Sequence, residues 1–157
     1  MIEVAAGRLV SVRPRLFARR VSQLEVSLWG RLAHRLRTGD RCWLYYRQPR
    51  RLRQFLIVDY ALSAQGTSLA TIRGALGALD ELARWKRCDA ILCDVTTARI
   101  SDRLLARWGW QAHAPSPWHR HFIKRFYGQY PATDTLAGAM LARELASPSD
   151  ARLALCR

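Results

Sequence analysis

Apolar residues recur along the chain with two different spacings, which predict both strands and helices. Apolar and polar positions roughly alternate over 2–12 and then meet Pro14, so we predict a first strand there. Over 18–37 the apolar residues return at every third or fourth position, which is the period of an amphipathic helix. Thr38, Gly39 and Asp40 follow and predict a helix end and a turn.

The middle of the chain predicts a hairpin followed by a long helix. Residues 41–48 and 54–62 are rich in aromatic and β-branched side chains, and the basic sequence PRRLR lies between them, as in an antiparallel hairpin. The unbroken apolar run FLIV at 55–58 is typical of a central strand that is covered on both faces. After a loop over 63–68, apolar spacing predicts a helix over 69–86. Its two glycines each cost about 1 kcal/mol relative to alanine, which is tolerable where a helix lies close on a sheet.

The next segment predicts a strand, a short helix and a strand. A buried strand is expected over 88–95, and a short helix over 102–108 that ends at Gly109. The last strand is expected over 119–127. This order belongs to an α/β or α+β domain with a mostly buried sheet.

The chain past Pro131 predicts one more helix. Thr133 or Asp134 can cap it, and its apolar stripe either packs on the domain or meets a partner, the former being the safer prediction. The stripe consists of Leu136, Met140, Leu141 and Leu145. We therefore expect a single domain over 1–130, followed by a C-terminal helix and tail over 131–157.

The charge of the chain is strongly positive and uneven. The formal net charge is +14; residues 1–58 hold 13 cations against 3 carboxylates, and residues 59–157 hold 13 against 9. Such a field attracts polyanions, including nucleic acid, anionic membrane and phosphorylated cofactors. Of the 26 cations all but Lys86 and Lys124 are arginines, a bias that GC-rich codon use also produces. Both explanations of the charge stay open.

The cysteines and the apolar runs point to a protein of the cytoplasm. None of the four cysteines belongs to a CxxC pair, so we expect buried thiols in a reducing compartment. No apolar run approaches the ~20 residues of a membrane span, and the N-terminus lacks the layout of a signal peptide. We expect no membrane association, and the oligomeric state stays open.

The order of these elements resembles that of the GNAT acetyltransferase superfamily, over most of Phe55–Gly128. The resemblance implies a GNAT-like α/β (α+β) fold, with a twisted mixed sheet and helices on both faces. It also implies acetyl-CoA or another acyl-CoA as cofactor, and acyl transfer to an amine acceptor, which the sequence does not identify.

The family binds the cofactor pyrophosphate with a turn of pattern Q/R-x-x-G-x-G/A at the start of a helix. Free N–H groups and the positive end of the helix dipole hold phosphate oxygens there, and small residues allow close approach. Here the first and last positions match, and Ser68 stands where the first glycine belongs. The alternative, which is compatible, is that Thr67 or Ser68 simply caps the helix. The cofactor-binding residues implied are Gln65, Gly66, Thr67, Ser68, Leu69 and Ala70.

The family's general acid is missing from its usual place. The family pattern N-x-x-A-x-x-L-Y-x-x-L-G-F aligns its L-G-F with Trp108-Gly109-Trp110, which puts Leu105 at the position of the tyrosine. A leucine has no proton to donate. The resemblance therefore supports the fold better than it supports the usual chemistry.

Other residues can supply catalytic groups. Asp59, on the expected central strand, resembles the family's general base if burial raises its pKa; the alternative is an ion pair with one of the arginines. Tyr127 is a candidate for the missing acid, and His119 and His121 are reserve bases or ordinary strand-edge residues. These two with His113 have no further ligand at metal-site spacing, so we expect no metal.

The alternative function is a catalytically inactive GNAT-like domain that binds nucleic acid or a protein partner. Aromatic and cationic residues interleave over 118–127, as on a surface that stacks bases, although a core strand explains the same pattern. In this alternative the basic N-terminal half binds the phosphates, and Arg50, Arg51 and Arg53 of the hairpin turn contribute most.

Overall fold

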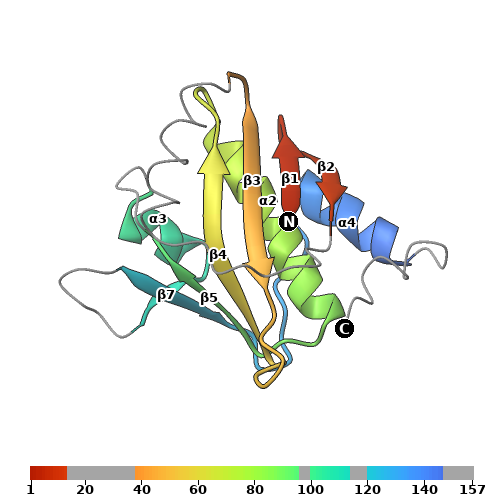
Figure 1. The fold of residues 1–157 in the computed structure, drawn as a ribbon, viewed down its shortest axis with the longest axis vertical. Coiled ribbons are helices and arrows are strands. Elements are labelled where there is room, and N and C mark those ends of the chain that lie inside the picture. Colours follow the sequence, from red (N-terminus) through yellow and green to blue (C-terminus); the bar gives the residue numbers. More distant parts are fainter. Residues whose placement is uncertain (14–37, 96–99, 114–119, 147–157) are drawn as a thin grey trace.

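The structure, a computed structural model, describes residues 1–13, 38–95, 100–113 and 120–146. Seven strands form one mixed sheet in the order β2-β1-β3-β4-β5-β7-β6, and the strand direction rotates across the sheet (Figure 1). The strands are β1 (Ile2–Ala5), β2 (Arg8–Val12), β3 (Arg41–Arg47), β4 (Phe55–Ser63), β5 (Ala90–Asp94), β6 (Gln111–Ala112) and β7 (His121–Arg125). The predicted mixed α+β class is confirmed.

Three helices are described, namely α2 (Leu69–Trp85), α3 (Asp102–Arg107) and α4 (Leu136–Ala146). α2 lies across one face of the sheet, and α4 packs on α2 and on β2 (Figure 1). The helix expected over 18–37 lies outside the described residues. Helices on both faces of the sheet therefore remain a prediction.

The N-terminal segment forms a hairpin, so the prediction of one strand over 2–12 is wrong. β1 and β2 pair antiparallel around a turn in which Ala6 and Gly7 have φ values of 47° and 73°. Two successive positive φ values match the right-handed twist of the flanking strands. The side chain of Thr71 in α2 accepts a hydrogen bond of 2.9 Å from the N–H of Gly7, which ties this turn to the helix.

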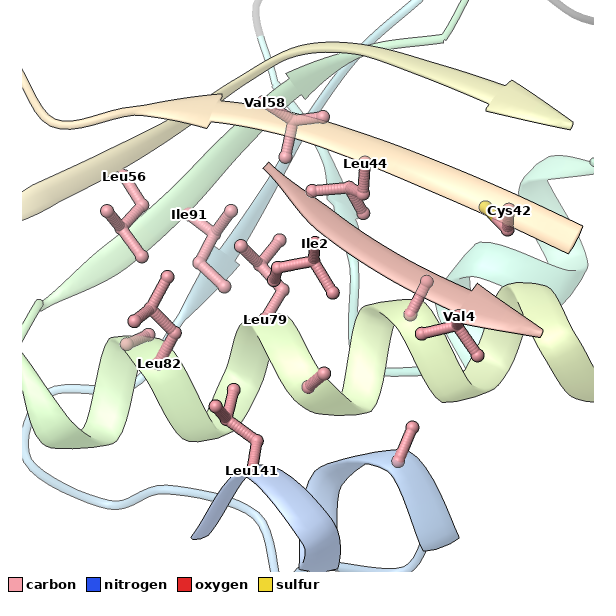
Figure 2. Packing of buried hydrophobic residues seen from close by; sticks show 14 of the residues in the cluster. Ile2, Val4, Cys42, Leu44, Leu56, Val58, Leu79, Leu82, Ile91 and Leu141 are labelled. Atoms are coloured by element: carbon pink, nitrogen blue, oxygen red, sulfur yellow. The ribbon is translucent and has the colours of Figure 1, made fainter. Parts of the chain in front are cut away.

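The hydrophobic core lies between α2 and the sheet (Figure 2). Leu79 and Leu82 of α2 pack towards Leu56 and Ile91 on the two central strands. Within the run FLIV, Leu56 and Val58 are buried, whereas Phe55 and Ile57 are half-buried. Leu56 and Val58 therefore lie on the face of β4 that packs on α2.

The glycines of α2 allow close contact mainly with α4. A Cβ at Gly77 would lie 2.1 Å from Thr135 Oγ1, and one at Gly74 would lie 3.4 Å from the Cβ of Ala137 in α4. Gly74 also approaches the β1–β2 hairpin. Of the two glycines in α2, Gly74 is therefore the one that makes the predicted close contact with the sheet. Leu141 of α4 is buried in the core (Figure 2). The C-terminal helix thus packs on the domain, although two residues of the predicted stripe, Leu136 and Met140, are exposed.

The pairing of β4 with β5 differs from every other pairing among the described strands, because it is parallel. It extends from Phe55↔Ala90 to Val58↔Cys93 and then stops. β4 continues to Ser63 and, among the described strands, pairs there with β3 alone, while β5 ends at Asp94. The two strands diverge beyond this point, next to the start of α2 (Figure 1).

Candidate functional site

The candidate site begins at the first turn of α2, where the sequence predicted phosphate binding. Ser68 is the N-cap, and its hydroxyl accepts a hydrogen bond of 3.1 Å from the N–H of Thr71. The hydroxyl of Thr67 donates to the carbonyl oxygens of Arg41 and Ala64. Capping by Ser68 is thus observed, and Thr67 fixes the preceding loop to the start of β3.

Asp40 places a carboxylate at the same helix end, which the sequence interpretation missed. Its Oδ1 accepts a hydrogen bond of 2.8 Å from the N–H of Ser68, and its Oδ2 accepts one of 2.9 Å from the Ser68 hydroxyl. Partial burial alone would raise the pKa of Asp40, but these hydrogen bonds and one involving Thr71 outweigh it and lower the pKa. An anion of the chain itself therefore already occupies part of this helix end.

Two backbone N–H groups of the turn stay available. Those of Leu69 and Ala70 have no hydrogen-bond acceptor in the described part of the chain. Gly66 has a φ of 91°, in the left-handed region that glycine adopts without strain. Gln65 accepts a hydrogen bond of 3.2 Å at its carbonyl from the N–H of Gly39, so its backbone holds the turn against the preceding segment. The turn can therefore donate two amide N–H groups to an anion, but the neighbouring carboxylate of Asp40 repels that anion.

Asp59 lies on β4 at the point where β4 and β5 diverge. Arg47 Nε donates to its Oδ1 at 2.7 Å, and both side chains are partly exposed. The ion pair that the sequence offered as the alternative for Asp59 is therefore observed.

His121 lies at the same end of the sheet as Asp59 and beside a second carboxylate. It is paired with Asp94 across β7 and β5, and its Nδ1 lies 4.0 Å from Asp94 Oδ1. Directly opposed residues share one face of a sheet, so register places Asp94 and His121 on the face that also carries Arg47, the ion-pair partner of Asp59. Asp94 was missed because only the strand register reveals its neighbour. His119 lies outside the described residues.

The other proposed acid, Tyr127, lies far from this group. It follows β7 in a turn, not in the strand predicted over 119–127, and it has a φ of 48° and an exposed fraction of 76%. β7 ends beside the start of β5, whereas α2 begins after the other end of β4. The structure therefore does not bring Tyr127 together with Asp59 or with the start of α2.

Leu105 is a core residue of α3. It is 3% exposed and belongs to the same buried cluster as Trp110 and Phe122. The helix around it matches the prediction, with Ser101 as N-cap and Gly109 at a φ of 83° after the helix. This position holds the fold together and offers no proton donor.

No family model, curated protein or solved structure matches the chain. The residues that the structure describes contain no helix long and apolar enough to span a membrane. In the same residues, no three His, Cys, Asp or Glu side chains gather as metal ligands would. Cys42 and Cys88 are buried free thiols, and burial raises the pKa of Cys42 to about 12.

A separate cleft of about 540 Å³ lies between α2, the turn after α3, β7 and the segment 129–135. Inside it, Lys124 Nζ and Asp80 Oδ2 form an ion pair at 2.6 Å, with side chains that are 11% and 14% exposed. Burial raises the pKa of Asp80 to about 6, although the charge of Lys124 opposes the shift. Trp110 also lines the cleft, and its Nε1 has no hydrogen-bond partner among the described residues. None of the residues predicted for the site lines this cleft.

Proposed function

We propose that this chain binds an acyl-CoA and belongs to the GNAT-like acyltransferases. The observation that supports this most is the divergence of the parallel strands β4 and β5 directly before α2. In the described part of the chain the pairing of β4 with β5 ends at Val58↔Cys93, so this edge of β4 then borders the opening between the two strands. The pantetheine arm of a CoA can pair with such an edge, as the resemblance to the superfamily implies.

The diphosphate belongs at the start of α2 in this proposal. The amides of Leu69 and Ala70 point out of the first helical turn, where the helix dipole favours an anion. Asp40 weakens this attraction because its carboxylate holds the N–H of Ser68. We therefore expect CoA to bind more weakly here than it would at a helix start without a nearby carboxylate.

The same end of the sheet supplies a base for acyl transfer to an amine. His121, with Asp94 next to it, can accept the proton of the attacking amine, after which the amide bond forms and the C–S bond breaks. Asp59 is the less suitable base, because it already pairs with Arg47. The departing thiolate has to take its proton from His121 or from water, since Leu105 has no proton to donate and Tyr127 lies at the other end of β7.

A thermal shift with CoA tests this proposal. At 100 times its Kd, a ligand stabilises the folded state by about 2.7 kcal/mol, which raises the Tm of a chain of this size by about 5–10 °C. Ser68→Asp keeps a residue that can cap the helix, although it loses the hydrogen bond to Asp40 and repels that carboxylate, and it adds a charge that repels the diphosphate, so we expect it to abolish the increase. Ser101→Asp makes the same change at the cap of α3 and should keep the increase. An unchanged Tm at millimolar CoA, or an equal loss in both variants, would refute the proposal.

The burial of Leu105 favours one second candidate, a GNAT-like domain that has lost catalysis. Such a domain would bind CoA or a partner without transferring the acyl group. Incubation with acetyl-CoA and a panel of primary amines distinguishes the two. An active enzyme releases free thiol in proportion to the amine, and His121→Ala should remove that release; an inactive domain releases none.

A further inference from the structure

Three connections from distant parts of the sequence meet at the end of the sheet opposite the start of α2. They are the β3–β4 turn (48–54), the α2–β5 turn (86–89) and the segment after β7 (126–130), which together we call the basic end. Asp89 N donates to Gln54 O at 2.7 Å, and Phe126 N donates to Asp89 O at 2.7 Å. These hydrogen bonds join the three connections side by side, at the lower end of the sheet in Figure 1.

The basic end contains five cations and one carboxylate, Asp89. The side chains of four of these cations are exposed and have no carboxylate partner among the described residues; they are Arg50, Arg51, Arg53 and Arg87. Arg41, Arg47, Arg73, Arg84 and Arg120 each lie in an ion pair, and other exposed arginines, such as Arg8, Arg13 and Arg143, lie on other parts of the chain. The basic end is thus a place where four exposed arginines come together on adjoining turns.

The backbone that presents these cations is fixed. Leu52 N donates to Pro49 O at 3.1 Å, and the amide of Gln48 contacts both the carbonyl of Arg53 and the Sγ of Cys88. Arg87 has a φ of 53° and donates its N–H to Arg84 O at 3.0 Å. Because the backbone is already fixed, only the arginine side chains have to be ordered when the basic end binds an anion.

An exposed aromatic ring lies at the same end. Tyr127 is 76% exposed in a left-handed conformation, which costs free energy for a residue other than glycine. The neighbouring Tyr130 is fixed, because its hydroxyl donates to Cys88 O at 3.0 Å and its ring contacts that of Phe126. The hairpin turn and Tyr127 are separated by two strand spacings, roughly 10 Å, which a few nucleotides can span.

We propose that the basic end binds single-stranded nucleic acid, with the arginines on the phosphates and Tyr127 stacked on a base. Guanidinium groups bind phosphate through two parallel hydrogen bonds, and an exposed aromatic ring stacks on any base. An anionic membrane would use the same charges, but it would not require an aromatic face. The proposal is independent of CoA binding, because the basic end lies at the opposite end of the sheet from the start of α2.

The test is fluorescence anisotropy with a labelled 20-nucleotide oligouridine at several salt concentrations. Four phosphate contacts predict a slope of about −3 for log K against log salt. Replacing Arg50, Arg51 and Arg53 by Ser should reduce this slope to about −1, and replacing all three by Lys should largely preserve it. Tyr127→Asn suits the left-handed backbone and should weaken binding by roughly 5- to 100-fold, with little change in slope.

The matched control replaces three other exposed cations, Arg8, Arg13 and Arg143, by Ser, which gives the same net charge. This variant should keep the affinity and the slope of the original protein. Equal losses in both triple variants, or no binding at micromolar protein, would overturn the proposal. Binding to vesicles of anionic lipid in preference to the oligonucleotide would overturn it as well.

Discussion

Asp40 determines how strongly the start of α2 can attract an added anion. Its carboxylate accepts hydrogen bonds from both the N–H and the hydroxyl of Ser68. Two unit charges 4 Å apart in water interact by about 1 kcal/mol, so removing this charge should tighten the binding of a diphosphate. We predict that Asp40→Asn lowers the Kd for CoA about five-fold in isothermal titration. Asp134→Asn removes a carboxylate that pairs with Arg73 instead and should leave the Kd unchanged. A Kd that does not fall in Asp40→Asn would place the diphosphate elsewhere.

The largely enclosed ion pair of Asp80 and Lys124 should make stability depend on pH. Burial raises the pKa of Asp80 from 3.8 to about 6, so between pH 4 and pH 6 the folded state keeps a proton that the unfolded state has lost. The free energy of unfolding therefore falls as the pH rises through this range, by up to about 3 kcal/mol, since one pKa unit corresponds to about 1.4 kcal/mol.

Urea denaturation at several pH values measures this effect. Asp80→Asn alone would leave the buried Lys124 charge without its partner, so the informative variant is Asp80→Asn combined with Lys124→Met. We predict that the double variant loses the decrease in unfolding free energy between pH 4 and pH 6. The same decrease in both proteins would mean that another group causes it.

At the scale of elements, Gly77 has the closest contact of the α2 glycines with the start of α4. A Cβ at position 77 would lie 2.1 Å from Thr135 Oγ1, the atom that accepts a hydrogen bond from the N–H of Gly138 at the start of α4. We predict that Gly77→Ala destabilises the protein by roughly 1–3 kcal/mol, despite the better helix propensity of alanine. Gly74→Ala meets only contacts of 3.4 Å and should change stability by less than about 1 kcal/mol. Equal unfolding free energies for the two variants would contradict this packing.

The sequence predicted most elements, because their signals are local. Ser68 and Ser101 mark helix starts by their own hydroxyls, and Gly109 marks a helix end by its freedom to adopt a positive φ. The β1–β2 turn escaped prediction because Ala6 adopts a positive φ that its residue type does not indicate. β6 has two residues, Gln111–Ala112, which is too short for any periodicity to appear.

At the scale of the whole molecule, the site depends on register, which no local pattern contains. Asp94 lies opposite His121, 27 residues away in the chain, because β5 and β7 pair antiparallel. Tyr127 is separated from Asp59 because β7 runs antiparallel to β5, so that Tyr127 follows the end of β7 that lies beside the start of β5. The sequence also showed that charge is concentrated in the first half of the chain. Arg50, Arg51, Arg53 and Arg87 lie together at the basic end only because separate turns pack side by side.

The central claim is that CoA binds where β4 and β5 diverge, and titration of the ¹⁵N-labelled protein with CoA tests it most directly. Amide NMR signals report on each part of the chain separately, so the site and the basic end can be distinguished. We predict shifts at residues 59–70, with the largest at the amides of Leu69 and Ala70. Shifts confined to 48–54 and 86–89 would show that CoA binds through its charge alone. Shifts confined to these two turns, or no shifts at millimolar CoA, would contradict the claim.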